Sequence, residues 1–580
     1  MSSEIAIEVE DFWFAYHRAS RPTLRRIALK VRAGELVLLT GVSGCGKSTL
    51  ALALAGMIPS QVHGEVRGRI HSRGHPIGPV PVREASRYVG LVFQNPNLQL
   101  FHQRVESEVA FGPENLCLPG EEVRARVMRA LAATGMVDLR HATISNLSGG
   151  QKQRTAIAAT MAMGPDVLVL DEPLSDLDPV GAQEVLHQLR RLADEHGAAI
   201  VLIEHRVDDV LGWCDRVLLM DDGQILLDAP ARAAFENPAP WQRSGVGLPD
   251  IVRVGRAFPE IFPGAQPLTA AEAAAALAGT PLQSALREAL RIGAGAASAV
   301  PAGRPALTWE GVSIAFGGPP VLDDVTLGID AGSWTALVGA NGCGKTTLAH
   351  TAVGLQELDR GEVRVLDEPV DTKRVGAQAG IVALLLQAAD EMLFCETVSK
   401  ELAFGAKYRK RDLASPFLDL GAITEAFGFA EMGDCSPWEL SQGGRQRLAL
   451  GALLVGAPAL LILDEPTTGQ DNEHRRAFMA LLDMIRKEAE MTLLMVTHDM
   501  RSVASRAQRL IVLGDAAVQL DGQPHAVFAR GEELAQWGVL PPPVARLQHE
   551  LVPDASRVAL EVDELVALMS PARQPEQVQV

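Results

Sequence analysis

Short runs of hydrophobic residues recur along the chain and alternate with longer amphipathic stretches. Three of these runs lie at residues 35–40, 166–170 and 199–203, and each contains four or five apolar residues in succession. Runs of this length predict strands that are buried on both faces, whereas the stretch 121–135 predicts a helix. Buried strands that alternate with helices indicate an α/β fold, with a mostly parallel sheet covered on both faces.

The same succession of elements occurs twice within the 580 residues. Four landmarks of the first half return after 293 residues (387 − 94 for the first pair): Gln94 and Gln387, Ser148 and Ser441, Asp171 and Asp464, and His205 and His498. Lys47 and Lys345 are instead 298 residues apart (345 − 47), so the length difference lies between the lysine and the glutamine. A constant offset over four landmarks indicates a tandem duplication of one folded unit.

A glycine-rich loop follows a predicted strand in each half and precedes a predicted helix. The loops read Gly41-Val-Ser-Gly-Cys-Gly-Lys-Ser-Thr49 and Gly339-Ala-Asn-Gly-Cys-Gly-Lys-Thr-Thr347. Both match G-x-x-x-x-G-K-[ST], a loop whose main-chain N–H groups surround nucleotide phosphates at a helix N-terminus. Its lysine reaches the β and γ phosphates, and the hydroxyl that follows is a ligand of Mg²⁺.

These two loops supply the expected phosphate-binding residues. The first loop contributes Gly41, Ser43, Gly44, Cys45, Gly46, Lys47, Ser48 and Thr49. The second contributes Gly339, Asn341, Gly342, Cys343, Gly344, Lys345, Thr346 and Thr347. Ser48 and Thr346 are also the expected hydroxyl ligands of Mg²⁺.

An acidic pair ends a hydrophobic strand in each half, as Asp171-Glu172 and Asp464-Glu465. A carboxylate at this place can hold the Mg²⁺ shell, while its neighbour orients and deprotonates the attacking water. We therefore assign the aspartates to the metal site and the glutamates to catalysis. An Asp-Glu pair by itself is common at solvated strand ends, but its repetition after a phosphate loop favours the catalytic interpretation.

A histidine follows the next hydrophobic strand in each half. His205 and His498 each lie 34 residues after the aspartate of their half (205 − 171; 498 − 464). A lone histidine would more often be structural, but this equal spacing favours a contact with the γ-phosphate. We count both histidines among the catalytic residues.

Composition restricts the setting in which the protein works. A formal charge of −18 argues against nucleic acid as the main partner, because nucleic-acid binding usually needs a basic face. The six cysteines form no C-x-x-C pair, which disfavours disulfides and zinc and suits a reducing cytoplasm. The N-terminus has no signal pattern, and no apolar run approaches the roughly 18 residues of a membrane span. If the protein serves transport, we expect its membrane part to be another chain.

A more specific motif lies between the glutamine and the acidic pair. It reads Leu147-Ser-Gly-Gly-Gln-Lys-Gln-Arg154 in the first half and Leu440-Ser-Gln-Gly-Gly-Arg-Gln-Arg447 in the second. With these motifs, both halves of the sequence resemble the ATP-binding-cassette (ABC) ATPases. The resemblance implies two tandem P-loop NTPase domains, each a RecA-like sheet with an antiparallel β subdomain and a helical subdomain.

The roles of further residues follow from this resemblance alone. In this family, two cassettes close head to tail, and the signature motif of one cassette completes the ATP site of the other. The signature residues of this sequence are Ser148, Gly149, Gly150 and Gln151 in the first half, and Ser441, Gln442, Gly443 and Gly444 in the second. Gln94 and Gln387 match the Q-loop, which senses Mg²⁺, the γ-phosphate and the membrane partner, so the resemblance places both among the catalytic residues and the Mg²⁺ ligands. Residues 175–178 and 468–471 match the D-loop. Tyr16 and Phe316 match the aromatic residue that stacks on adenine.

The segment after each Q-loop glutamine narrows the family. Gln94-Asn-Pro-Asn-Leu-Gln-Leu-Phe101 leads to Glu108-Val-Ala-Phe-Gly112, and Gln387 leads to Phe394 and Glu401-Leu-Ala-Phe-Gly405 at identical offsets. This pattern resembles the ATPase subunits of energy-coupling-factor importers for cobalt, nickel and vitamins. The fused form resembles ATPases assigned to thiamine-precursor import. Core packing of the phenylalanines is the alternative interpretation of these positions.

This narrower resemblance implies the partners and the location of the protein. The segment would line a groove that receives helices of a transmembrane coupling protein. A small substrate-binding membrane protein would complete the complex, and the chain would lie on the cytoplasmic side of the cell membrane without binding nucleic acid. The membrane subunits would choose the substrate, which this sequence does not encode.

Several positions depart from the pattern of the family. Gln442 stands where the signature usually has glycine, and Gly444 where it has glutamine, so we expect a strained backbone and a weakened signature there. By the head-to-tail pairing, the first phosphate loop would then be the slower site. Gln470 replaces the usual leucine of the second D-loop, and Glu204 precedes His205 where threonine is commoner.

The motifs set the predicted domain boundaries. The two ABC domains are predicted at residues 1–238 and 306–535. Residues 239–305 are predicted to form an appendage with an Ala/Gly-rich linker, and residues 536–570 a repeated C-terminal appendage. Residues 571–580 are predicted to form a disordered tail. Three other functions agree less well with the sequence. ATPases of sugar or peptide importers would not be expected to repeat the Phe and Glu-x-Ala-Phe-Gly pattern after the Q-loop in both halves. Two-cassette translation factors carry a charged helical linker, whereas the linker of this sequence is near neutral. DNA-repair ATPases carry long coiled-coil or zinc insertions, which this sequence does not have.

Overall fold

The computed structural model describes residues 4–17, 19, 21–175, 177–293, 303–408, 419–467 and 472–570. These residues fall into two compact units. The first unit holds the chain up to Thr280, and the second holds most of the chain from Pro281 onward. Each unit is described by itself below.

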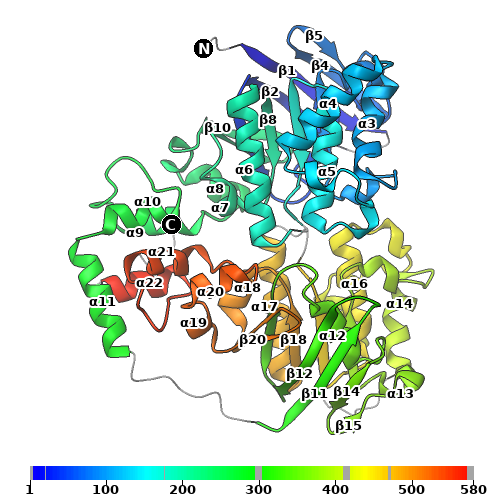
Figure 1. Ribbon diagram of the computed structural model, residues 1–580, viewed down its shortest axis with the longest axis vertical. Coiled ribbons are helices and arrows are strands. Elements are labelled where there is room, and N and C mark those ends of the chain that lie inside the picture. The colour runs from blue at the N-terminus through cyan, green and yellow to red at the C-terminus, as the bar shows by residue number, and fades with distance from the viewer. Residues whose placement is uncertain are drawn as a thin grey trace. The chain divides into compact units, whose positions relative to one another are not determined.

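A six-stranded sheet with the order β10-β9-β3-β8-β7-β6 forms the centre of the first unit (Figure 1). Its strands are β3 (Leu36–Gly41), β6 (Val89–Val92), β7 (Val167–Asp171), β8 (Ala199–Ile203), β9 (Arg216–Asp221) and β10 (Gln224–Pro230). Every neighbouring pair is parallel except β9 with β10. The strands β3 and β8 are buried along their whole length, as their continuous apolar runs predict.

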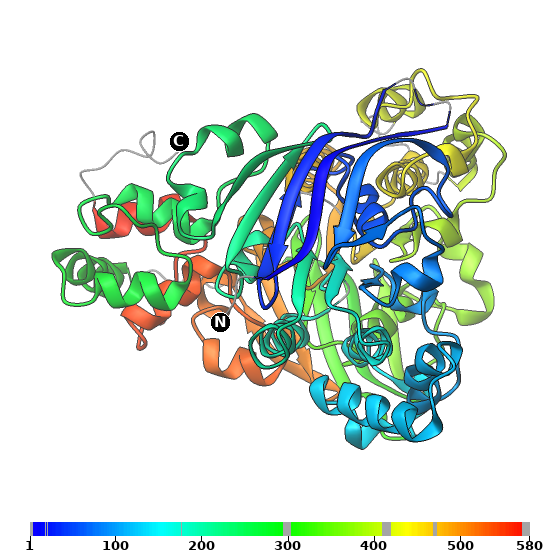
Figure 2. The ribbon, with the colours of Figure 1, turned by 90° about the horizontal axis from the view of Figure 1, so that it is seen from above.

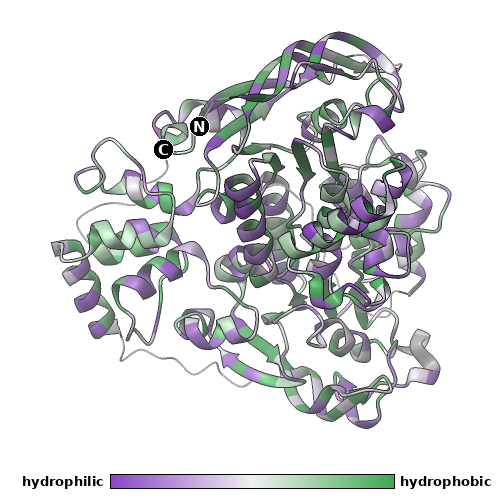
Figure 3. Cartoon of the chain, turned by 45° about the horizontal axis from the view of Figure 1, so that its top comes forward, coloured by the Kyte–Doolittle hydropathy of each residue, from purple (hydrophilic) through white to green (hydrophobic). Residues whose placement is uncertain are grey.

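A second, antiparallel sheet of the first unit has the order β2-β1-β4-β5. It contains β1 (Ile5–Tyr16), β2 (Leu24–Arg32), β4 (Gly64–Ser72) and β5 (His75–Ile77). Figure 2 shows β1 between its two long neighbours. Hydrophobic and hydrophilic residues alternate along these strands (Figure 3), so one face of the sheet packs against the core while the other faces solvent.

Helices cover the large sheet and build a separate helical subdomain. The longer helices are α1 (Lys47–Leu54), α3 (Val105–Asn115), α4 (Gly120–Ala133), α5 (Gly149–Ala162) and α6 (Pro179–His196), and the short ones are α2 (Val82–Ala85) and α7 (Val207–Val210). Helix α6 packs Leu186 and Leu189 against one face of the sheet, and α1 packs Leu50 on the other. Helices α3, α4 and α5 enclose a small core of their own, with Val109 and Leu131 buried.

The second unit repeats this architecture. Its six-stranded sheet, in the order β16-β17-β18-β13-β19-β20, contains β13 (Trp334–Val338), β16 (Val382–Leu385), β17 (Leu460–Asp464), β18 (Thr492–Val496), β19 (Arg509–Gly514) and β20 (Ala517–Gly522). The antiparallel sheet contains β11 (Pro305–Ala315), β12 (Pro320–Asp330), β14 (Arg360–Val365) and β15 (Glu368–Pro369). The helices are α12 (Lys345–Ala352), α13 (Val375–Gln378), α14 (Val398–Gly405), α15 (Leu420–Ala426), α16 (Gln442–Val455), α17 (Asn472–Glu488) and α18 (Met500–Arg506). The α/β fold class and the duplication are therefore confirmed.

Small helical appendages follow each large sheet. The first comprises α8 (Ala239–Ser244), α9 (Asp250–Ala257) and α10 (Ala270–Leu277), and the second α19 (Pro524–Val527), α20 (Gly531–Gln536), α21 (Pro543–Leu551) and α22 (Val562–Met569). Helix α11 (Pro281–Gly293) belongs to the second unit and packs on α22, so the boundary between the units lies inside the predicted segment 239–305. The predicted tail 571–580 and residues 294–302 of the linker lie outside the described residues.

Among the described residues, no helix is both long and apolar enough to cross a membrane. The longest apolar strands are instead covered by helices within each unit.

Gln548 should be a strong determinant of the stability of the second appendage. Its buried amide donates to Arg557 O at 2.8 Å and accepts the N–H of Ala559 at 2.7 Å. Gln548→Leu leaves both main-chain groups unpaired, so the local unfolding free energy should fall by about 2 kcal/mol or more. Hydrogen exchange over residues 543–569 measures this loss. Gln536→Leu, at an exposed position of α20, should change it little; equal protection in both variants would contradict the prediction.

Candidate functional site

The two phosphate loops hold their lysines in the same way. Lys47 Nζ donates to Gly41 O at 3.0 Å and to Val42 O at 2.9 Å. Lys345 Nζ donates to Gly339 O at 2.9 Å and to the next carbonyl at 2.8 Å. Each ammonium group therefore lies at the start of a helix, α1 or α12, where main-chain N–H groups also favour an anion.

Backbone geometry explains why these loops contain glycine at two positions. Gly46 and Gly344 precede their helices with φ values of 108° and 102°, a conformation that side chains rarely adopt. A Cβ atom at Gly41 would lie 2.3 Å from Met220 O, and one at Gly339 would lie 2.2 Å from Leu513 O. The loops therefore pack against the neighbouring strand, β9 or β19, at a distance that only glycine allows.

The first acidic residue of each pair is buried beside the loop hydroxyl. Asp171 is hydrogen-bonded to Ser48, and Asp464 to Thr346. Burial raises the pKa of Asp171 and raises the pKa of Asp464 to about 6, and in both cases the negative charge of the adjacent glutamate adds to the shift. One oxygen of each carboxyl group is buried without a hydrogen-bond partner among the described residues. A hydroxyl and a buried, unpartnered carboxyl oxygen fit the ligand preference of Mg²⁺.

The second acidic residue of each pair contacts the predicted histidine. Glu172 Oε1 lies 2.8 Å from His205 Nε2, and Glu465 Oε2 lies 2.8 Å from His498 Nδ1. Both glutamates have left-handed φ values, 48° and 49°, which are unusual outside glycine. Such strain is typical of functional sites, where the surrounding structure holds a residue in place.

The two Q-loop glutamines differ in their contacts. Gln94 Nε2 donates to Glu172 Oε2 at 3.1 Å, which joins the Q-loop to the acidic pair and to His205. Gln387, at the corresponding position of the second unit, has an exposed side chain. The structure therefore brings together glutamine, glutamate and histidine in the first unit, and glutamate and histidine in the second.

The aromatic residues predicted to stack on adenine also differ. The hydroxyl of Tyr16 lies 3.0 Å from Thr49 Oγ1, so β1 is tied to the phosphate loop of the first unit. Phe316 has no hydroxyl to make this bond, and its side chain is 63% exposed. Both rings lie at the end of the first strand of the antiparallel sheet, where an aromatic face is available for stacking.

The signature motifs form the N-termini of α5 and α16. Ser148 accepts the N–H of Gln151 at 3.3 Å, and Gln151 Oε1 accepts the N–H of Ser148 at 3.0 Å, which completes a capping box. Ser441 accepts the N–H of Gly444 at 3.2 Å, but Gly444 has no side chain to return the bond. The N-terminus of α16 therefore lacks the second hydrogen bond of the capping box, which is present in α5.

The backbone strain expected at Gln442 is not found. Gln442 is the first residue of α16, and its φ is not among the left-handed values of the chain. The expectation was wrong because this position has ordinary helical geometry, which a glutamine adopts freely. The slower first site and the head-to-tail pairing of loops with signatures stay predictions.

The D-loop predictions are only partly covered by the structure. Asp178 caps α6 by accepting the N–H of Gly181 at 2.8 Å, and Ser175 is buried. Asp176 and residues 468–471, which include Gln470, lie outside the described residues.

A buried glutamate organises the segment after each Q-loop, a role that the sequence pattern did not reveal. Glu108 Oε2 accepts the N–H groups of Phe101 and His102 at 2.9 and 2.7 Å. In the second unit, Glu401 Oε2 accepts the N–H groups of Phe394 and Cys395 at 3.0 and 2.7 Å. The equal spacing of these glutamates after each glutamine was the signal that could have identified them.

Each buried glutamate supports a pair of aromatic rings, the first of which is exposed. Phe101 packs edge-on against Phe111, with ring centroids 4.6 Å apart, and Phe394 packs in the same way against Phe404 at 4.7 Å. Phe101 and Phe394 are 63% and 64% exposed. Core packing, the alternative interpretation of this motif, therefore does not describe the first phenylalanine of either pair.

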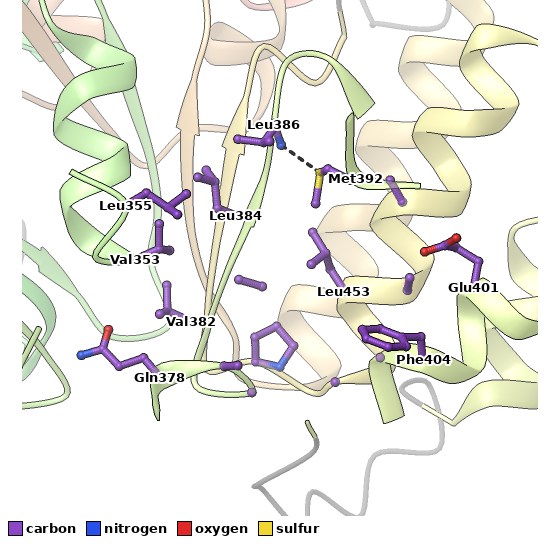
Figure 4. A pocket seen from close by; sticks show the side chains of 18 of the residues that line it. Val353, Leu355, Gln378, Val382, Leu384, Leu386, Met392, Glu401, Phe404 and Leu453 are labelled. Atoms are coloured by element: carbon purple, nitrogen blue, oxygen red, sulfur yellow. Dashed lines mark hydrogen bonds between the residues drawn. The ribbon is translucent and has the colours of Figure 1, made fainter. Parts of the chain in front are cut away.

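An apolar cavity of about 360 Å³ opens beside the aromatic pair of the second unit. It lies between β16, the end of α12, and the helices α14 and α16. Figure 4 shows Leu384, Met392, Phe404 and Leu453 around it, with Glu401 as the labelled acidic residue. The exposed ring of Phe394 also lines this cavity, so the surface offers both a protruding and a recessed apolar element.

Comparison with known proteins gives consistent matches. A family model described as ABC transporter matches residues 24–175 and 322–468. A Methanosarcina mazei protein with the provisional name ABC transporter ATP-binding protein is 35% identical over 575 residues, covering 97% of this chain and 96% of that protein. A Bacillus subtilis protein, provisionally named HMP/thiamine import ATP-binding protein YkoD, is 32% identical over 533 residues, covering 91% and 94%. The solved structure of cbiO1 from Clostridium perfringens, described as part of the ABC transporter complex cbiONQ, is 33% identical and covers 42% of this chain and 96% of its own, with a TM-score of 0.38.

Metal-dependent nucleotide binding at the second loop should weaken in mild acid. Because the pKa of Asp464 is raised to about 6, its carboxylate form is available above that pH and is lost below it. In a Lys47→Ala background, the affinity for a fluorescent ATP analogue with Mg²⁺ should fall between pH 7.5 and 5.5. Asp464→Asn should remove this dependence, and Asp515→Asn, at an exposed turn, should keep it. An affinity equal at both pH values in the parent would refute the prediction.

Proposed function

Since the chain belongs to the ABC transporter family of ATP-binding proteins, we propose that it energises an importer of the energy-coupling-factor type. Its ATPase activity is that of the family, and both units carry the motifs for it. In this proposal, two composite MgATP sites drive separate transmembrane subunits. The imported substrate is a vitamin, a vitamin precursor such as a thiamine precursor, or a transition-metal ion.

The proposed hydrolysis uses the same residues in each unit. Lys47 and Lys345 neutralise the β and γ phosphates, and the main-chain N–H groups of the loops surround them. Glu172 and Glu465 each take a proton from the water that attacks the γ-phosphorus, while ADP leaves on the opposite side. A ring nitrogen of the histidine lies 2.8 Å from a carboxylate oxygen of the glutamate in each unit and fixes the orientation of that glutamate. The histidine can also donate a hydrogen bond to the γ-phosphate.

In each unit, Mg²⁺ would be held by the hydroxyl that follows the loop lysine and by the aspartate that ends β7 or β17, with Gln94 and Gln387 as further ligands. The residues are Ser48 with Asp171, and Thr346 with Asp464. Bound there, the ion would neutralise charge that develops on the phosphate oxygens.

The observation that carries the importer type is the anchored aromatic pair of each unit. The glutamate fixes the main chain of the loop, so the exposed phenylalanine is presented in a defined place. An exposed apolar side chain beside an apolar cavity favours a helix of a membrane protein as its partner. The partners in this proposal are a transmembrane coupling protein and a small substrate-binding membrane protein, and the chain binds them at the cytoplasmic face of the membrane.

The identity of the imported substrate is supported only by the name of one relative. The name of the Bacillus subtilis relative refers to HMP/thiamine import, and that relative matches 91% of this chain. A thiamine precursor is therefore the first substrate to test in a reconstituted complex.

Co-expression with a transmembrane coupling protein and a small substrate-binding membrane protein of the energy-coupling-factor type tests the importer type. We expect a detergent-stable complex with one coupling protein and one small substrate-binding protein. A stable complex with a sugar or peptide permease, or sedimentation with ribosomes, would replace the proposal by another function.

Substitution of both proposed bases should abolish turnover. Glu172→Gln with Glu465→Gln removes the groups that accept the proton of water, so the steady-state ATPase rate should fall by a factor of about 10² to 10⁴. Affinity for ATP should remain, as measured with a fluorescent analogue. Glu195→Gln, on the exposed face of α6, is the matched control and should keep the parental rate. Undiminished hydrolysis in the double variant would exclude this assignment of the base.

Loss of the loop anchor should uncouple the ATPase from its membrane partners. Glu401→Ala frees the N–H groups of Phe394 and Cys395, so the aromatic pair is no longer held in place. Recovery of the membrane subunits with the tagged chain should fall at least several-fold, with a larger loss when Glu108→Ala is added. Glu396→Ala, at an exposed ion pair five residues earlier, should leave recovery unchanged. Full recovery in the Glu401→Ala, Glu108→Ala chain would argue against this surface as the docking site.

A further inference from the structure

Glu204 is a buried carboxylic acid at the end of β8, directly before His205. Its side chain is 2% exposed. Glu204 Oε1 accepts the main-chain N–H of Leu174 at 2.9 Å, while its own N–H donates to Leu39 O. Leu174 lies two residues after Glu172, in the segment that leads from β7 to α6. The glutamate therefore joins the strand that carries the histidine to the turn that carries the proposed base.

That turn needs external support. Glu172 has a left-handed φ of 48°, which the local sequence does not favour. Its N–H donates to Ile203 O at 3.0 Å, so one side of the turn is tied to β8 by the main chain. The bond from Leu174 to Glu204 ties the other side to the same strand. Together the two bonds fix the position of Glu172 relative to His205.

The second unit holds the corresponding turn differently. Thr497 occupies the position of Glu204, and its hydroxyl accepts the N–H of Asp499, a local contact. Thr467, which corresponds to Leu174, has its hydroxyl 3.5 Å from Asp499 Oδ2. Although burial opposes it, the charge of Arg475, together with hydrogen bonds from Ser502, lowers the pKa of Asp499 to about 2. In the second unit, the side chain of Thr467 therefore contacts an ionised carboxylate that follows the histidine in the sequence.

The charge state of Glu204 suits its place near Glu172. Burial first, and then the charge of Glu172 and of Asp209, raise the pKa of Glu204 to about 8, while the Leu174 N–H and Arg206 oppose this shift. At neutral pH its carboxyl group is therefore protonated. A neutral carboxyl group still accepts the N–H of Leu174, and it adds no second negative charge beside the proposed base.

We propose that Glu204 is a positioning residue for ATP hydrolysis at the first phosphate loop, because its side chain holds the turn of Glu172 against the strand end of His205. The inference rests on the proposed role of Glu172 as the base. The second unit has no equivalent of the bond from Leu174 to Glu204, because Thr497 stands at the position of Glu204 and its hydroxyl binds the N–H of Asp499.

The test compares Glu204→Ala with Glu204→Gln in the full chain carrying Glu465→Gln, so that hydrolysis reports on the first loop. Single-turnover rates with enzyme in excess, and the affinity for a fluorescent ATP analogue, are measured for each variant. Glu204→Ala should lower the rate at least tenfold with affinity changed less than twofold. Glu204→Gln keeps an acceptor for Leu174 and should retain at least half the parental rate. Thr497→Ala, the matched change in the second unit, should leave this rate within twofold.

A pH profile separates positioning from general stabilisation. The parental rate should fall above about pH 8, as Glu204 ionises among Glu172, Asp209 and Arg206, whereas the Glu204→Gln rate should not. A Glu204→Ala rate within twofold of the parent, or equal losses in the Ala and Gln variants, would overturn the inference. If Glu204→Ala fails to fold, Glu204→Thr, whose hydroxyl is too short to reach Leu174, carries the same expectation.

Failure of the proposed base is distinguishable from failure of the inference. If Glu172→Gln keeps the parental single-turnover rate, the role of Glu172 is refuted whatever Glu204 does. If Glu172→Gln abolishes the rate and Glu204→Ala does not, only the inference is refuted. Should Glu465→Gln alone stop all hydrolysis, the two sites are coupled, and the same comparison of Glu204 variants is decisive in the chain with Glu465 intact.

Discussion

Parallel pairing of three central strands determines where the functional groups of each unit meet. In the first unit, β3 pairs with β8 and β8 with β7, so the carboxyl ends of all three strands lie at one edge of the sheet. The phosphate loop follows β3, the acidic pair ends β7, and the histidine follows β8. Because side chains at this edge are bordered by buried strands, their carboxyl groups are partly desolvated, and the shifted pKa values of Asp171 and Asp464 follow from that burial.

The sequence allowed prediction of those features that depend on a single local segment. The loops at Gly41 and Gly339, the buried strands and the repeated order were recognisable, because each has a fixed local pattern and occurs twice. Contacts between distant segments were not predictable in this way. The hydrogen bonds between Tyr16 and Thr49 and between Gln94 and Glu172 depend on how two separate segments pack. The conformation of Gln442 was misjudged because a glycine in a family pattern does not always mark an unusual φ.

Duplication preserved the architecture but not the details of the two sites. Tyr16 is hydrogen-bonded to its loop whereas Phe316 cannot be, and Gln151 completes a capping box that Gly444 cannot complete. Each difference removes a polar contact without removing a buried apolar one. The hydrophobic cores of the two units therefore remain alike, while polar contacts at the phosphate loops and signatures differ between them.

The position of α11 has a consequence for dividing the gene into two. This helix follows the first appendage in sequence, yet Leu286 is fully buried within the second unit, and Gln283 donates to Leu551 O at 2.8 Å. Separate polypeptides made by cutting the chain after Thr280 would each keep the helices that complete their own cores. A cut within residues 294–302, which look like the natural linker by composition, would instead leave α11 on the wrong fragment and expose an apolar face on both products.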